Sequence, residues 1–169
     1  MLVAVLHLDI VAPHSRFARQ LDIPLVVALR VTPYIGKNWL TDKVNGLAFH
    51  QVPDVKANVT KAIGDANWKR LLDLRDHKIK RVNDTELGSI IVLNQCNVDG
   101  GCGPTALLML KLNAEFVGAC LFDDKTDTNS WFGPNWRATS KQQPGAISEC
   151  YGEDPIPKFK EVAKTAKPQ

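Results

Sequence analysis

The stretch from Gln95 to Pro104 places the strongest constraint on how this chain folds. Cysteine and glycine dominate it, in the order Gln-Cys-Asn-Val-Asp-Gly-Gly-Cys-Gly-Pro. The apolar run over 88–94 leads into the stretch and predicts a buried strand. The run over 105–112 leads out of it and predicts a helix, because Ala, Leu, Met and Lys have high helix propensity. The sequence therefore predicts a glycine-rich turn that joins a strand to a helix.

Cys102 is the candidate nucleophile of this turn. A thiol at a helix N-terminus lies beside unpaired N–H groups and the positive end of the helix dipole, which lower its pKa. The same N–H groups can hold an oxyanion, which makes the backbone of Cys102 and Gly103 candidate donors. The structural alternative is a small buried cysteine in a tight turn.

A second folding pattern for this region stays open. If residues 105–112 form a strand instead of a helix, Leu112-Asn113-Ala114-Glu115 becomes a hairpin turn that leads into the apolar run over 115–122. Helix propensity favours the first pattern.

The nucleophile segment resembles that of papain-like cysteine peptidases. The matching residues are Cys-Gly-Pro-Thr-Ala-Leu-Leu-Met from Cys102 onward, with Gln95 seven residues upstream of the cysteine. The bacteriocin-processing and OTU-like branches are the most similar, the latter through Asp99-Gly100-Gly101-Cys102. The resemblance implies that Cys102 caps a central helix and that the Gln95 side chain and the Cys102 N–H form the oxyanion hole. It also implies a protein or peptide substrate and no cofactor.

The order of the histidines departs from this family. All four (His7, His14, His50 and His77) precede Cys102, whereas papain-like peptidases place the catalytic histidine after the cysteine. A permuted papain-like fold has the observed order. So do the chymotrypsin-like cysteine peptidases of positive-strand RNA viruses, whose Gly-x-Cys-Gly motif is similar to Gly100-Gly101-Cys102-Gly103. The second resemblance implies a viral origin, although Cys120 stands where that family has its substrate-pocket histidine.

His50 is the candidate base for the thiol. A base must lie within hydrogen-bond reach of the nucleophile, wherever it is in the sequence. His50 lies in the run over 47–52, which predicts an ordered strand near the core. His14 follows a proline at a predicted turn, and His77 lies in a basic stretch.

The whole chain predicts one α+β domain. Its 169 residues are 44% hydrophobic and 23% charged, which is enough apolar content for one core. We expect a mixed sheet of about five strands with one long helix over 54–76 packed on it. Asn45-Gly46 predicts a turn, and Gly64 weakens the middle of the long helix. Residues 1–150 form the predicted globular domain, and 151–169 a Pro- and Lys-rich C-terminal tail.

Composition limits the classes of partner. A net charge of +3 does not by itself support nucleic-acid binding. The apolar runs are too short for a membrane span, and the cysteine spacing does not match a metal knuckle or a compact disulfide framework. We therefore expect a reduced, cytoplasmic protein (in the host cytoplasm if viral) without metal or cofactor.

Two functions follow from these patterns. The first is a cysteine peptidase or related thiol hydrolase with Cys102 as nucleophile, His50 as base and Gln95 as oxyanion donor. The alternative is a non-enzymatic interaction or assembly module, or a degenerate peptidase fold used for binding. The missing downstream histidine favours the alternative, and the Gly-Gly-Cys-Gly-Pro turn favours the enzyme.

Overall fold

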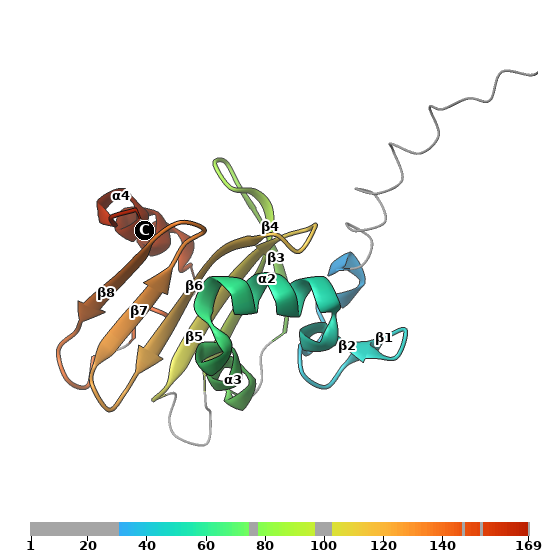
Figure 1. Ribbon diagram of the computed structural model, residues 1–169, viewed down its shortest axis with the longest axis horizontal. Helices are drawn as coiled ribbons and strands as arrows, with labels where there is room; N and C mark the ends of the chain where they lie inside the picture. Colours follow the sequence, from blue (N-terminus) through green and yellow to red (C-terminus); the bar gives the residue numbers. More distant parts are fainter. Residues whose placement is uncertain (1–30, 75–77, 97–102, 147, 153, 169) are drawn as a thin grey trace, which may run out of the picture.

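A six-stranded antiparallel sheet forms the centre of the molecule. The computed structural model describes residues 31–74, 78–96, 103–146, 148–152 and 154–168. Within them the strands follow one another across the sheet in chain order (Figure 1). They are β3 (Lys80–Asp84), β4 (Gly88–Cys96), β5 (Thr105–Lys111), β6 (Phe116–Asp123), β7 (Thr128–Phe132) and β8 (Arg137–Lys141).

The α+β class predicted from the sequence is confirmed, but the details of the sheet are not. The sheet has six strands instead of five, and every described pairing in it is antiparallel, so it is not mixed. The apolar runs over 1–11 and 23–31 also predict strands from the sequence alone, and all of these residues except Val31 lie outside the described part of the chain. Short turns join all neighbouring described strands except β4 and β5, whose connection includes residues 97–102.

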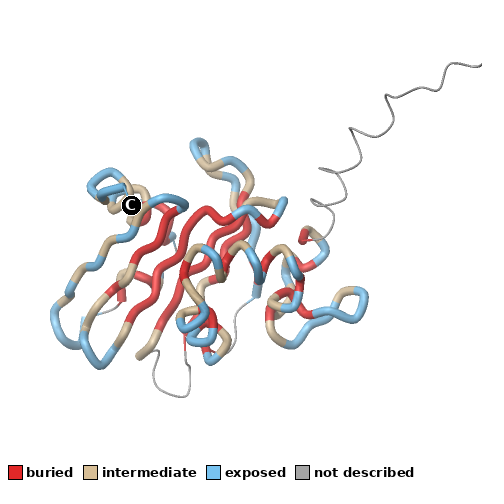
Figure 2. Tube along the Cα trace, in the orientation of Figure 1, coloured by how far each residue is buried: buried red, intermediate tan, exposed pale blue. Residues whose placement is uncertain are grey.

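Both faces of the central strands are buried. On one face, Ile91, Leu93, Leu108 and Leu121 pack with residues of α2 (Pro53–Ile63) and α3 (Asp65–Asp73). On the other, Leu107, Met109 and Trp131 pack with residues of α4 (Ile156–Thr165). Burial is therefore continuous along β5 and β6 up to their last residues, and along residues 90–93 of β4 (Figure 2).

Two-sided burial explains why the helix predicted over 105–112 is wrong. Residues Thr105–Lys111 form β5, and all of them except Lys111 are buried. A strand covered on both faces needs no alternation of apolar and polar residues, so its apolar run resembles a buried helix. Packing between β4 and β6 outweighs the helix propensity of Ala, Leu and Met.

The hairpin alternative for this region is confirmed. The backbone N–H of Lys111 donates to the Glu115 carbonyl at 2.8 Å, and the N–H of Ala114 donates to the Lys111 carbonyl at 3.0 Å. Ala114 has a φ of 65°, in the left-handed region. A hairpin loop that ends in a left-handed residue is a common solution.

The long helix predicted over 54–76 is two helices. Gly64 separates α2 from α3 with φ 86° and ψ 158°, a conformation that ends α2 and opens α3. Glycine adopts this backbone without the steric penalty that a Cβ brings. Val55, Val59 and Ile63 of α2 and Trp68 and Leu71 of α3 are buried in the core.

The segment before α2 folds against these helices. Its elements are η1 (Thr32–Tyr34), the two-residue strands β1 (Lys43–Val44) and β2 (Leu47–Ala48), and η2 (Phe49–Gln51). The turn predicted at Asn45-Gly46 is confirmed, with φ values of 50° and 83°. The strand predicted over 47–52 is only partly correct, because it changes into a 3₁₀ turn at Phe49.

Disulfides correct the expectation of a reduced chain. Cys120 of β6 is bonded to Cys150, with their Cα atoms 5.2 Å apart, and Cys96 is also disulfide-bonded. No described cysteine is free. Cys120 points to the α4 face of the sheet, where the chain leading into α4 passes over it. The fold thus brings together cysteines whose spacing in the sequence did not indicate a disulfide framework.

The end of the chain packs on the sheet. Within the segment predicted as a tail, α4 buries Ile156 and Phe159 in the same cluster as Met109 and Trp131. Lys160 of α4 forms an ion pair with Asp84 at 2.8 Å. None of the helices in the described ranges is long and apolar enough to cross a membrane.

Candidate functional site

The predicted nucleophile, Cys102, lies outside the described residues, as do His7, His14 and His77. Gly103 is the first described residue after it, and a Cβ at this position would lie 2.8 Å from Oδ2 of Asp124. Because the residues after Pro104 form β5, they supply no helix N-terminus to this loop. The helix-dipole argument for a lowered thiol pKa at Cys102 is therefore lost.

Gln95, the predicted oxyanion donor, is a buried residue near the end of β4. It is 1% exposed and lies opposite Ala106 of β5, on the face that α2 and α3 cover. Neither its Nε2 nor its Oε1 has a hydrogen-bond partner among the described residues. A buried amide without partners costs about 1–3 kcal/mol of folding free energy, so this side chain has hydrogen-bonding capacity to spare.

His50, the predicted base, is a half-buried residue of η2. Its Nδ1 lies 3.2 Å from the Trp39 carbonyl oxygen, and its ring meets the Trp39 indole edge-to-face with centroids 6.0 Å apart. A carbonyl oxygen can only accept, so Nδ1 is the donor in this contact. The structure thus gives His50 and Gln95 separate surroundings, one beside Trp39 and the other opposite Ala106.

A buried polar cluster on the opposite face was not predicted from the sequence. The Thr105 hydroxyl donates to Ser148 Oγ at 2.7 Å, and Ser148 donates to Asn129 Oδ1 at 3.3 Å. The backbone N–H of Cys150 donates to Ser148 Oγ at 3.0 Å. Every group in the cluster is neutral and none can act as a general base, so the cluster holds the segment that carries Cys150 in place.

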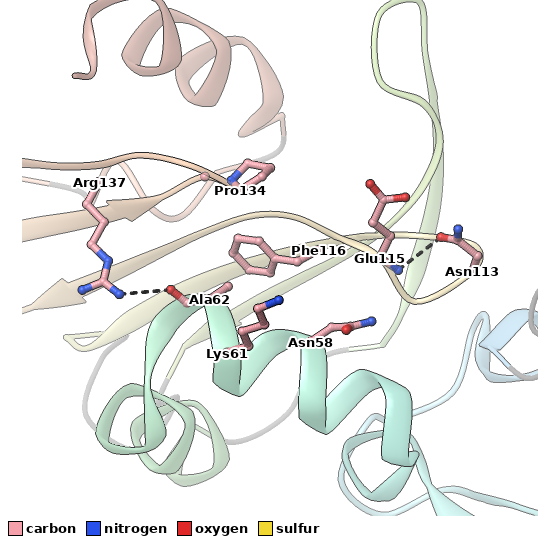
Figure 3. A pocket seen from close by; sticks show the side chains of 9 residues that line it. Asn58, Lys61, Ala62, Asn113, Glu115, Phe116, Pro134 and Arg137 are labelled. Carbon is pink, nitrogen blue, oxygen red and sulfur yellow. Dashed lines mark hydrogen bonds between the residues drawn. The ribbon is translucent and has the colours of Figure 1, made fainter. Parts of the chain in front are cut away.

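The larger described cavity lies on the same side of the sheet as α2. It has a volume of about 510 Å³, within the range of small-molecule pockets. The end of α2, the β5–β6 hairpin and the turn between β7 and β8 enclose it (Figure 3). The lining residues are Asn58, Lys61, Ala62, Asn113, Glu115, Phe116, Gly133, Pro134 and Arg137.

Hydrogen bonds between these elements fix the walls of the cavity. Arg137 donates from Nη2 to the carbonyl of Ala62, near the end of α2, at 3.3 Å, and its guanidinium lies 5.5 Å from the centroid of the Phe132 ring. Asn58 donates from Nδ2 to the Ala114 carbonyl at 2.9 Å. The contacts join α2 to β8 on one side and to the β5–β6 hairpin on the other, so the cavity is built on regular elements.

Charged groups in this cavity have no ion-pair partner in the described part of the chain. Lys61 and Arg137 supply cationic groups and Glu115 a carboxylate, and none of the three forms a salt bridge there. In the view of Figure 3, the Phe116 ring lies between Arg137 on one side and Glu115 on the other. The cavity can therefore offer opposite charges to a ligand around an aromatic wall.

Sequence reasoning did not select any of these lining residues. These residues line one cavity because α2 and two hairpins that are far apart in the sequence meet there. No local sequence pattern predicts that meeting. The available signals were the hairpin alternative at Leu112–Glu115 and the Gly133-Pro134 turn, which follows the buried Trp131 and Phe132.

A second cavity in the described residues is smaller. A cavity of about 170 Å³ lies between α3 and the ends of β5 and β6, with Arg70 and Asp73 at its edge. In the same described ranges, no group of three or more His, Cys, Asp or Glu side chains is arranged to hold a metal ion.

Comparison with known proteins gives this chain no relatives: no protein-family model, no curated protein and no solved structure matches it.

Proposed function

We propose that this chain is a non-enzymatic binding domain, stabilised by disulfides, that takes up a small ligand or peptide segment in the cavity between α2 and the two hairpins. The observation that carries the proposal is the cavity itself, which combines a rigid frame with Lys61, Glu115 and Arg137 as charged groups without ion-pair partners. The lining is more polar than the mainly apolar walls of most small-molecule sites, so the proposed ligand is one that is held chiefly by its charges and hydrogen bonds.

An oxidising compartment suits this binding domain. Disulfides form and persist in secreted and extracellular proteins and are rare in the cytosol. The expectation of a cytoplasmic location depended on reduced cysteines, and Cys96, Cys120 and Cys150 are all disulfide-bonded. We therefore propose that the protein functions outside the reducing cytosol.

A matched pair of variants tests binding in the cavity. Lys61→Trp puts an indole into it, whereas Lys56→Trp puts the same indole on an exposed position of α2 that does not line it. In a fragment screen by ligand-observed NMR, the wild type and Lys56→Trp should bind the same fragments and Lys61→Trp should lose them. Equal binding by all three proteins would show that the cavity is not the site.

The thiol hydrolase is the competing proposal, and Gln95 is the described residue that favours it. Its buried, unpartnered amide is a hydrogen-bond donor of the kind that an oxyanion hole uses. Alkylation with iodoacetamide in the absence of reductant separates the two proposals. A hydrolase requires rapid labelling of Cys102 and loss of peptide hydrolysis in Cys102→Ser, and the binding domain requires neither.

A further inference from the structure

We infer that the cavity between α2 and the two hairpins recognises a zwitterionic ligand of the short-peptide class, with its carboxylate at Arg137 and Lys61 and its ammonium at Glu115. This inference rests on the proposed binding function and names the chemistry of its ligand. The observations that carry it are the charges of the lining and their separation around Phe116.

Arg137 is oriented for a carboxylate before any ligand arrives. One of its N–H groups is used on the Ala62 carbonyl, and its guanidinium is held over Phe132. The contacts limit the rotamers of a long side chain and leave its other N–H donors without a protein partner in the described residues. A guanidinium that keeps two parallel donors binds a carboxylate in a bidentate manner, and fixing it in advance reduces the entropy lost on binding.

Lys61 reinforces the anionic end of the ligand. It precedes Ala62 on α2 and lines the same cavity, so its ammonium adds a second positive charge to the lining. Both residues are exposed cations without an ion-pair partner among the described residues, so together they favour an anion over a neutral group.

Glu115 is the residue that favours a positive group on the ligand. Its backbone N–H donates to Asn113 Oδ1 at 3.1 Å, which fixes the hairpin from which the carboxylate projects. A bare anion would leave this carboxylate without a partner and would be repelled by it. A ligand that also carries an ammonium satisfies Glu115, and the adjoining Phe116 and Pro134 accommodate the apolar atoms between the two charges.

Trialanine and its blocked forms test this assignment by titration calorimetry. Trialanine should bind with a Kd of about 1 mM or tighter. N-acetyl-trialanine lacks the ammonium and trialanine amide lacks the carboxylate, and each should bind about tenfold more weakly, as expected for one lost charge-assisted contact. Equal affinity for all three peptides, or binding by none of them at about 10 mM, would overturn the zwitterion assignment.

Variants then assign each end of the peptide. Glu115→Gln should remove the preference for trialanine over its N-acetylated form. Arg137→Gln should reduce the preference over the amide, because Lys61 remains as a cation for the carboxylate. Arg137→Lys keeps the positive charge but lacks the paired N–H donors of the guanidinium, and it is the second variant if Arg137→Gln does not fold. Lys125→Gln lies in the β6–β7 turn outside the cavity and should bind like the wild type. Preferences as large as those of the wild type in these variants would contradict the assignment. If the zwitterion assignment fails while Lys61→Trp still abolishes fragment binding, the binding function stands and only the ligand class is wrong.

Discussion

Gly118 of β6 lies directly against the C-terminal helix α4. A Cβ at this position would overlap the ring of Phe159, the buried aromatic of α4. Trp136 also packs against that ring, with centroids 5.4 Å apart. Because Gly118 has no Cβ, the Phe159 ring of α4 can pack directly on the backbone of β6.

Gly118→Ala should lower the free energy of unfolding by about 1–3 kcal/mol, the usual cost of overpacking a core. Equilibrium unfolding in urea, followed by circular dichroism, measures the change. Gly152→Ala is the matched control, because a Cβ there has nothing within 4 Å. Equal stability of the two variants would mean that α4 does not depend on this contact.

At the scale of the elements, what the sequence predicts depends on whether the governing contacts are local. The Asn45-Gly46 turn and the weakness at Gly64 were predictable, since each is a backbone requirement of one or two residues. The state of residues 105–112 was not, because it depends on α4 and α2 covering opposite faces of β5. The cavity could not be predicted from the sequence either, because its walls come from α2 and two hairpins that meet only in the folded protein.

An ion pair ties two elements together and gives the fold a pH dependence. Asp84, at the end of β3, accepts a hydrogen bond from Lys160 of α4, which with the backbone N–H groups of Leu87 and Glu86 lowers the pKa of the carboxyl to about 2. Because this value is below that of an unfolded aspartate, about 3.9, the pair stabilises the fold above that pH. The contribution is lost as pH falls towards 2.

The stability of the wild type relative to Asp84→Asn should therefore be constant near neutral pH and should shrink as pH falls below about 4. The asparagine keeps an acceptor oxygen for the turn N–H groups of Glu86 and Leu87 and removes only the charge. Urea unfolding at a series of pH values measures the difference, and NMR titration of the Asp84 carboxyl gives its midpoint directly. A midpoint near 4 would show that Lys160 does not hold the carboxylate in solution.

At the scale of the whole molecule, the Cys120–Cys150 disulfide joins the centre of the sheet to the segment that leads into α4. It closes a loop with a sequence separation of 30 residues. Both cysteines are fully buried, and Cys150 is also held by Ser148 of the buried polar cluster. The loop contains β7, β8 and two members of that cluster, Asn129 and Ser148. The bond therefore limits the conformations of this part of the chain in the unfolded state as well as in the folded one.

Replacing both cysteines, as Cys120→Ala/Cys150→Ala, should lower the free energy of unfolding by about 3–4 kcal/mol, the loop entropy that a cross-link of this length removes from the unfolded state. The variant keeps Cys96 unchanged, so the effect belongs to this one bond, whereas a reductant would act on the Cys96 disulfide as well. Its urea transition should move to lower concentration and steepen, because an unfolded chain without the cross-link exposes more surface.

The binding proposal adds a second expectation for this double variant. The cavity is framed by α2, the β5–β6 hairpin and the β7–β8 turn, whose mutual contacts do not include the disulfide. The double variant should therefore still bind trialanine under conditions where it is folded. An unchanged transition midpoint would show that the bond adds nothing to stability, and a folded variant that no longer binds would show that the cavity depends on the α4 face of the sheet.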